Sequence, residues 1–131
     1  MLFQIDLTGV SPAEVFSQFW IAQPVSDEGR TFAENLVEGV TRRRRSIDAV
    51  VAGCSEHWRV ERMAVVDRNV LRMAVYEMLS HPETSHVVVI DEAIEVAKKF
   101  GGEESGAFVN GVLDAIRRSV ERGEVSLPPA D

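Results

Sequence analysis

The stretch Ser105–Ser119, SGAFVNGVLDAIRRS, decides between two folds for this chain. Its Asn110-Gly111 pair is a strong turn signal, but a two-residue hairpin turn needs strands on both sides. The apolar residues around the pair instead recur at the helical spacing of three and four, and they are Phe108, Val109, Val112, Leu113, Ile116 and Val120. The stretch therefore predicts one helix, in which Gly111 costs about 1 kcal/mol relative to alanine. We expect that glycine to allow close approach of another helix or a ligand.

Other helices are predicted along the rest of the chain, and strand-like alternation is not sustained anywhere. Ser11–Glu14 and Thr31–Glu34 both read as capping boxes, with Ser or Thr followed three residues later by Glu. We expect the second box to begin a helix whose inner face holds Phe32, Leu36, Val37 and Val40. The spacing of Ile47, Val50, Val51 and Cys54 predicts another helix.

Two further helices follow in the second half of the chain. Asp67 is the expected N-cap of one of them, and Pro82 closes that segment. Apolar residues at helical spacing extend from Ile90 to Phe100 and predict a helix over His86–Gly101. Gly101-Gly102 supplies its stop signal.

Length and composition bound the class of protein. The chain has 131 residues, of which 45% are hydrophobic, so one domain can bury a sizeable core. No apolar run approaches the roughly 20 residues of a membrane span, and the N-terminus shows no signal peptide. The single cysteine, Cys54, excludes an internal disulfide framework. These features predict a cytoplasmic protein with no membrane contact.

The net charge is −7, and the acidic excess is larger in the second half of the chain. This balance excludes a uniformly basic surface for nucleic-acid binding, so any contact with nucleic acid must be local. It also suits a basic partner for the acidic half.

Catalytic and metal patterns are weak. Cys54 and His57 have short ligand spacing, but no second tight pair follows, and His81 and His86 flank a proline loop. Gly101-Gly102 lacks the strand and the lysine of a phosphate loop. We therefore expect no metal, no cofactor and no enzymatic activity. Arg72 and Tyr76, four residues apart, read as packing and polar-network residues.

Three stretches, in this order and at this spacing, resemble the NusB family of bacterial transcription antitermination factors. They are Val66–Leu79 (VDRNVLRMAVYEML), Val89–Gly101 (VIDEAIEVAKKFG) and Glu103–Asp114 (EESGAFVNGVLD). The resemblance covers nearly all the chain and is weakest over residues 8–60. It implies an all-α fold, a compact bundle of about six to seven helices in two small helical subdomains. We expect residues 1–126 to form this single domain and residues 127–131 to form a flexible tail.

The resemblance also implies a function. Family members bind boxA-type RNA together with NusE, a small-subunit ribosomal protein, and help RNA polymerase read through terminators, especially in ribosomal RNA operons. No reaction is catalysed. The alternative is a fragment of a ribosomal-RNA cytosine methyltransferase, whose RNA-binding domain is NusB-like. A helical interaction module with no RNA role is the third hypothesis.

The RNA surface that the resemblance implies lies on the first helix and at the start of the last. Phe3, with Gln4 beside it, and Phe108 are candidates for stacking on bases, which contributes roughly 1–3 kcal/mol per base. Glu104 matches an acidic family position that influences RNA affinity. Helix N-terminal amides around Ser105 are candidates for meeting a phosphate.

The NusE surface that the resemblance implies involves Glu61, Asp67 and Arg68. A basic ribosomal protein would suit the acidic excess of this half of the chain.

The chain departs from the family pattern at its start. Family members begin with an arginine-rich lead into the first helix, whereas Met1–Ile5 resembles the middle of that helix. Either the true start lies upstream, or this form has a truncated first helix and has lost those phosphate contacts. We expect weak RNA binding by this form alone, because each lost phosphate contact lowers the salt slope by about one. Self-association through the apolar start, which would give a homodimer, stays an open alternative.

Arg42–Arg45 matches no family motif. Successive helix residues lie about 100° apart, so four arginines in a row cannot all face one ligand. A solvated helix junction and a supplementary RNA patch are both open interpretations of this run.

Overall fold

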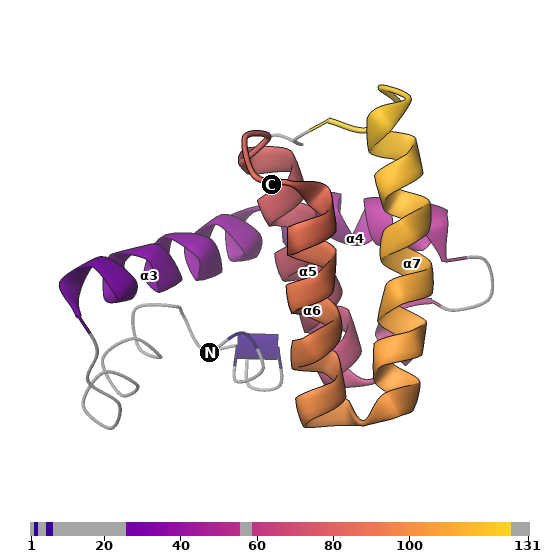
Figure 1. Cartoon of the computed structure of the whole chain (residues 1–131), viewed down its shortest axis with the longest axis horizontal. Coiled ribbons are helices and arrows are strands. Elements are labelled where there is room, and N and C mark those ends of the chain that lie inside the picture. Colours follow the sequence, from indigo (N-terminus) through magenta and orange to yellow (C-terminus); the bar gives the residue numbers. More distant parts are fainter. Residues whose placement is uncertain (1, 3–4, 7–25, 56–58, 127–131) are drawn as a thin grey trace.

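The structure is a computed structural model that describes residues 2, 5–6, 26–55 and 59–126. All regular elements within these ranges are helices, which confirms the all-α class (Figure 1). The predictions for Phe3, Gln4, Ser11–Glu14 and the 127–131 tail lie outside the described residues. The described helices are α3 (Asp27–Arg42), α4 (Arg44–Cys54), the 3-10 helix η1 (Val60–Arg62), α5 (Val65–Ser80), α6 (His86–Gly101) and α7 (Glu103–Glu121).

Helix α5 lies at the centre of the fold. It contacts α3, α4, α6 and α7, and Figure 1 shows α5, α6 and α7 running side by side while α3 extends to one side. Such a position requires an apolar residue on most faces, and the sequence VLRMAVYEM supplies them. Leu71 and Val75 are fully buried on α5, and Met78 is nearly so. Burying one such side chain contributes about 1.5–3 kcal/mol.

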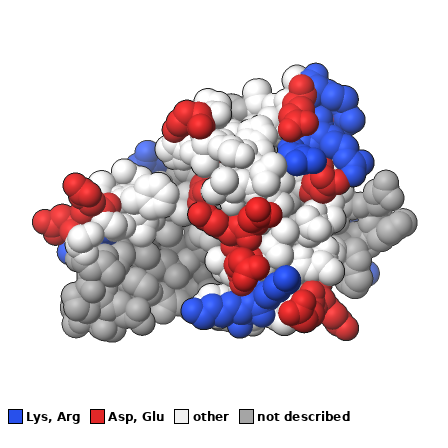
Figure 2. Space-filling model, viewed as in Figure 1, with Lys and Arg blue, Asp and Glu red and all other residues white. Residues whose placement is uncertain are grey.

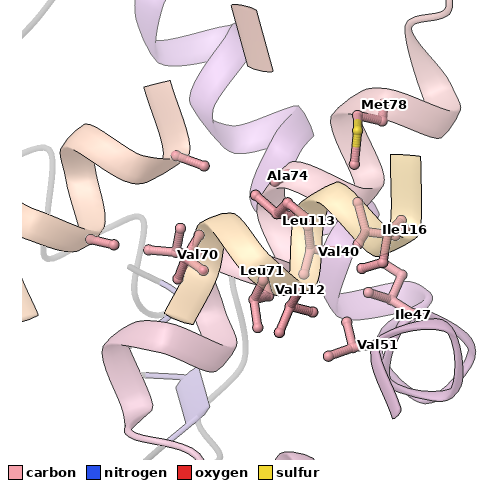
Figure 3. Close-up of a cluster of buried hydrophobic side chains, with 14 of the residues drawn as sticks. Val40, Ile47, Val51, Val70, Leu71, Ala74, Met78, Val112, Leu113 and Ile116 are labelled. Atoms are coloured by element: carbon pink, nitrogen blue, oxygen red, sulfur yellow. The ribbon is translucent and has the colours of Figure 1, made fainter. Parts of the chain in front are cut away.

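The core joins α5 to the helices on either side. Figure 3 shows side chains of α3, α4, α5 and α7 meeting in one cluster. The buried members drawn and labelled there are Val40, Ile47, Val51, Val70, Leu71, Ala74, Met78, Val112, Leu113 and Ile116.

Helix α7 is continuous across Asn110-Gly111, as the spacing predicts. Val109, Leu113 and Ile116 are fully buried along one face. The expected close approach of another helix at Gly111 is wrong, because a side chain added there would meet no protein atom within 4 Å, and the approach of a ligand there stays a prediction. Helical periodicity therefore outweighs the turn signal, and Gly111 simply lies on the solvent side.

Close approach occurs instead at Gly39 of α3, where an added Cβ would collide with the ring of Tyr76. The turn between α6 and α7 depends on another glycine. Gly102 has a φ of 88°, a left-handed conformation that favours glycine, and it lets α7 begin two residues after α6 ends.

Two predicted helix starts are wrong. Helix α3 begins at Asp27, because Ser26 caps it by accepting a hydrogen bond from the Gly29 N–H at 3.2 Å. The Thr31–Glu34 box therefore lies inside the helix, and Phe32 is 59% exposed rather than turned inward. Helix α5 begins at Val65 after Ala64, so Asp67 lies in its first turn and is not the N-cap.

Candidate functional site

A buried carboxylate ties the N-terminal part of the chain to α4 and α5. The Asp6 side chain is 3% exposed and accepts two hydrogen bonds from Arg68, from Nε and Nη2, both at 2.7 Å. Arg72 Nη1 and Asn69 Nδ2 each donate to it at 2.9 Å, and Arg44 Nη2 donates at 3.3 Å. Burial raises the pKa of Asp6, but the hydrogen bonds from Arg68 and Asn69 and the charges of Arg72 and Arg68 lower it to about 2.

Arg72 joins this network to α4. Its Nε and Nη2 donate to the two carboxylate oxygens of Asp48 at 2.7 and 3.0 Å, and Nη1 also donates to Asn69 Oδ1 at 3.1 Å. The prediction of a polar network around Arg72 is confirmed. Asp6 and Asp48 were not predicted as its partners, although an arginine within the apolar run of α5 is itself a signal that a carboxylate lies nearby, since a buried charge needs a partner.

The residues assigned to the protein partner fall on two sides of α5. Glu61 is exposed on η1, and Arg68 Nη1 donates to the Glu61 main-chain oxygen at 3.4 Å, so these two residues lie together. Asp67 is only 8% exposed, and its Oδ1 has no hydrogen-bond partner. It lies near Ser105 beside Gly101, where α6 meets α7. The structure therefore gives Glu61 and Arg68 one surface and buries Asp67 elsewhere.

The residues assigned to RNA that the structure describes lie at the start of α7. Glu104 is exposed in the first turn, and Phe108 is half-buried against the core one turn later. Ser105 is 8% exposed, so its side chain is turned inward. The first turn also carries Glu103, and two carboxylates there oppose a phosphate at the helix N-terminus.

An exposed aromatic and two lysines end α6 beside this site. Phe100, whose helical spacing suggests an inward position, is 66% exposed. Lys99 lies over its ring with Nζ 5.5 Å from the centroid, and Lys98 lies in the same last turn. Sequence reasoning missed Phe100 as a surface residue, because its spacing along α6 is the same as that of the buried residues.

Charge on the visible face of the molecule is divided into small groups. Figure 2 shows separate acidic and basic clusters on that face, and its described residues form no continuous basic band there. Within the described ranges no three His, Cys, Asp or Glu side chains are placed to hold a metal ion. None of the helices described here is long and apolar enough to span a bilayer.

The four-arginine run is divided by the helix junction. Helix α3 ends at Arg42 and α4 begins at Arg44, with Arg43 between them. The guanidinium of Arg43 lies 5.8 Å from the centroid of the Tyr76 ring, whereas Arg44 reaches Asp6 on another side. The predicted helix junction is confirmed, and Arg43 and Arg44 contact different neighbours on either side of it.

The fold and these surfaces define an all-helical protein whose distinctive groups are surface charges and aromatic rings held by a rigid α5–α7 core. The NusB family matches residues 1–118. The chain belongs to the NusB family.

Curated relatives match over most of both lengths. The transcription antitermination protein NusB of Sorangium cellulosum is 46% identical over 122 residues, covering 93% of this chain and 87% of the relative. The protein of the same name from Anaeromyxobacter dehalogenans is 47% identical over 130 residues, covering 98% and 86%.

Solved structures agree with this assignment. A structure of NusB from T. maritima is 35% identical, with a TM-score of 0.81, and the match covers 95% of this chain and 89% of that one. A structure of the antitermination factors NusB and NusE in complex with double-stranded RNA is 29% identical, with a TM-score of 0.82, covering 90% and 88%.

Proposed function

We propose that this protein is a transcription antitermination factor that binds boxA-type RNA jointly with NusE. The observation that supports this most is the similarity, over 90% of the chain, to the solved NusB–NusE complex with RNA. We further propose that the protein acts in the cytoplasm within an RNA polymerase antitermination complex, especially on ribosomal RNA operons. It acts by binding and catalyses no reaction.

The relatives favour this function over a methyltransferase fragment. The chain covers 86–87% of the two antitermination proteins reported above, so its similarity extends over most of both molecules.

Two surfaces carry the proposed binding. RNA is bound by Phe3 and Gln4 together with the start of α7, where Phe108 and Glu104 lie one turn apart. Ser105 can take part only through its main-chain amide, because its side chain is buried, and the carboxylates of Glu103 and Glu104 weigh against a phosphate at that amide. A ring half-buried against the core stacks at little further loss of side-chain freedom.

NusE is bound on the surface that Glu61 and Arg68 share. Asp67 supports this surface indirectly, from its buried position at the junction of α5 with α6 and α7. Arg68 is held by Asp6, so it is oriented before the partner arrives.

A transcription read-through assay tests the proposal. A template carrying boxA upstream of a terminator is transcribed in an extract from which the endogenous NusB protein has been removed, with and without this protein. We expect read-through to rise when the protein is added, and only on the template with intact boxA. Equal read-through on a template with scrambled boxA, or no response to the protein, would refute the proposal.

A further inference from the structure

A cavity of about 390 Å³ opens between α3 and the C-terminal end of α5, and we call it the α3–α5 cavity. Its α3 side is lined by residues at helical spacing, which share one face of that helix: Phe32, Asn35, Leu36, Gly39 and Arg43. Tyr76 of α5 and His81, the C-cap of α5, line the other side. Of the residues assigned to RNA or to NusE, none that the structure describes lines this cavity.

The ring of Tyr76 is held on two sides. It lies against Gly39, where an added Cβ would collide with it, and the guanidinium of Arg43 lies 5.8 Å from the ring centroid. The Tyr76 hydroxyl has no hydrogen-bond partner among the described residues. The cavity therefore has a fixed aromatic wall with a hydroxyl group that can donate to a ligand.

An apolar ring and a guanidinium at the cavity are open to solvent. Phe32 is 59% exposed and lines the cavity instead of joining the core. Arg42, which also lines it, is exposed in the last turn of α3, and no carboxylate in the described part of the chain pairs with it. The cavity thus offers an apolar contact at one end and a positive charge at the other.

The charges around the cavity favour a ligand with few carboxylates over a polyanion. Arg42 and Arg43 give it two positive charges against one negative charge, that of Glu38. Glu34 lies one turn before Glu38 on α3, and Glu83 follows the end of α5. A nucleic-acid strand carries a charge on every phosphate and would meet these carboxylates outside the cavity. A peptide with a single carboxylate avoids that repulsion.

The cavity lies away from the two surfaces of the proposed function. Tyr76 follows Arg68 by eight residues, which is about 12 Å along a helix. The start of α7 lies near Asp67, at the N-terminal end of α5, whereas the cavity lies at the C-terminal end (Figure 1). A ligand in the cavity therefore leaves room for RNA and NusE.

The spacing of the two ends sets the form of the ligand. Phe32 and Arg42 are ten residues apart on α3, about 15 Å along the helix. About five residues of an extended peptide span that distance. A guanidinium presents N–H groups in a planar fork that matches the two oxygens of a carboxylate.

We propose that the α3–α5 cavity binds a short segment of a third protein, in which a carboxylate lies about five positions from an aromatic or large aliphatic side chain. The apolar side chain packs on Phe32 and Leu36. The carboxylate accepts hydrogen bonds from Arg42 and from the Tyr76 hydroxyl. The inference goes beyond the proposed function, because it adds a protein partner to RNA and NusE.

The test selects ligands from a phage-displayed library of random dodecapeptides on the whole chain. Selected peptides are synthesised with a fluorescent label, and anisotropy gives their dissociation constants for wild type, R42Q, F32A and Y76F. Arg118→Gln and Phe100→Ala are the matched controls, since Arg118 is 63% exposed on α7, Phe100 is 66% exposed at the end of α6, and neither lines the cavity. Thermal melts check that the variants are folded.

We expect a class of selected peptides with an acidic residue about five positions from an aromatic or large aliphatic one. R42Q weakens their binding about ten-fold or more, because a charge-assisted hydrogen bond is lost. F32A weakens it about ten-fold through lost apolar contact. Y76F, which keeps the ring, weakens it by about two- to ten-fold. Both controls bind as wild type does, and saturating NusE does not displace the peptides.

Three results would overturn the inference. If no selected peptide depends on both Arg42 and Phe32, or if the peptides that do so lack an acidic residue, the cavity does not bind this ligand. If single-stranded RNA without boxA displaces the peptides, the cavity is a nucleic-acid contact. If NusE displaces them, the cavity belongs to the NusE surface and no third protein is needed.

Discussion

Replacing Asp6 by asparagine tests how the N-terminal part of the chain is attached. Loss of one member of a buried ion pair costs about 3–5 kcal/mol, because the other charge is left unpaired. Here Arg72 keeps Asp48, and Arg68 keeps the Glu61 carbonyl, so the lower end applies. We expect D6N to lower the free energy of unfolding by about 3 kcal/mol at pH 7, and the melting temperature by roughly 10 °C.

The difference in unfolding free energy between wild type and D6N must depend on pH in a defined direction. Because the pKa of Asp6 is about 2 in the folded protein and 3.8 ordinarily, the ionised carboxylate stabilises the fold by about 2 kcal/mol above pH 4. This stability is lost as pH falls from 4 towards 2. The difference between wild type and D6N therefore narrows over that window, while other carboxylates cancel in the comparison.

Urea unfolding at pH 7, 4, 3 and 2 measures both effects. Asp114→Asn is the control, because Asp114 lies in a surface ion-pair group on α7 and its loss is worth less than about 1 kcal/mol. A loss below 1 kcal/mol for D6N at pH 7, or a difference that stays constant down to pH 2, would refute the network as described.

Three further substitutions test the fold. Burial and the charge of Glu92 raise the pKa of Glu77, so the charged form of Glu77 destabilises the fold above that raised pKa. E77Q is therefore expected to raise the free energy of unfolding at pH 7, by an increment that shrinks as pH falls through the raised pKa. An unchanged urea midpoint at pH 7 would contradict this. Gly111→Ala is expected to stabilise by up to about 1 kcal/mol, since nothing opposes the added methyl group. Gly39→Ala is expected to destabilise despite the same gain in helix propensity, because Tyr76 must move; equal melting shifts for the two glycine variants would show that the packing assignment is wrong.

Periodicity predicted the helices but not their surroundings. The limits of α6, His86–Gly101, and the continuity of α7 follow from apolar spacing and from Gly102, which are local features. The start of α3 does not follow from apolar spacing, because Ser26 and Thr31 both offer a capping oxygen, and the spacing alone does not decide between them.

The site was less accessible to sequence reasoning because it depends on residues far apart in the chain. Asp6 and Arg68 are 62 positions apart, and no local spacing reveals their pairing. The sequence does not show that Asp67 is buried, because which face of α5 is covered depends on where α6 and α7 pack, and its assignment to the partner surface stays a prediction.

Joint binding of RNA and NusE is tested by the dissociation constant of boxA RNA for this protein with and without saturating NusE, for wild type and F108A. We expect weak binding by the protein alone and tighter binding with NusE. We also expect F108A to lose roughly 1–3 kcal/mol of RNA-binding free energy both with and without NusE. Identical affinity with and without NusE, or for boxA and a scrambled RNA, would contradict the proposed joint binding.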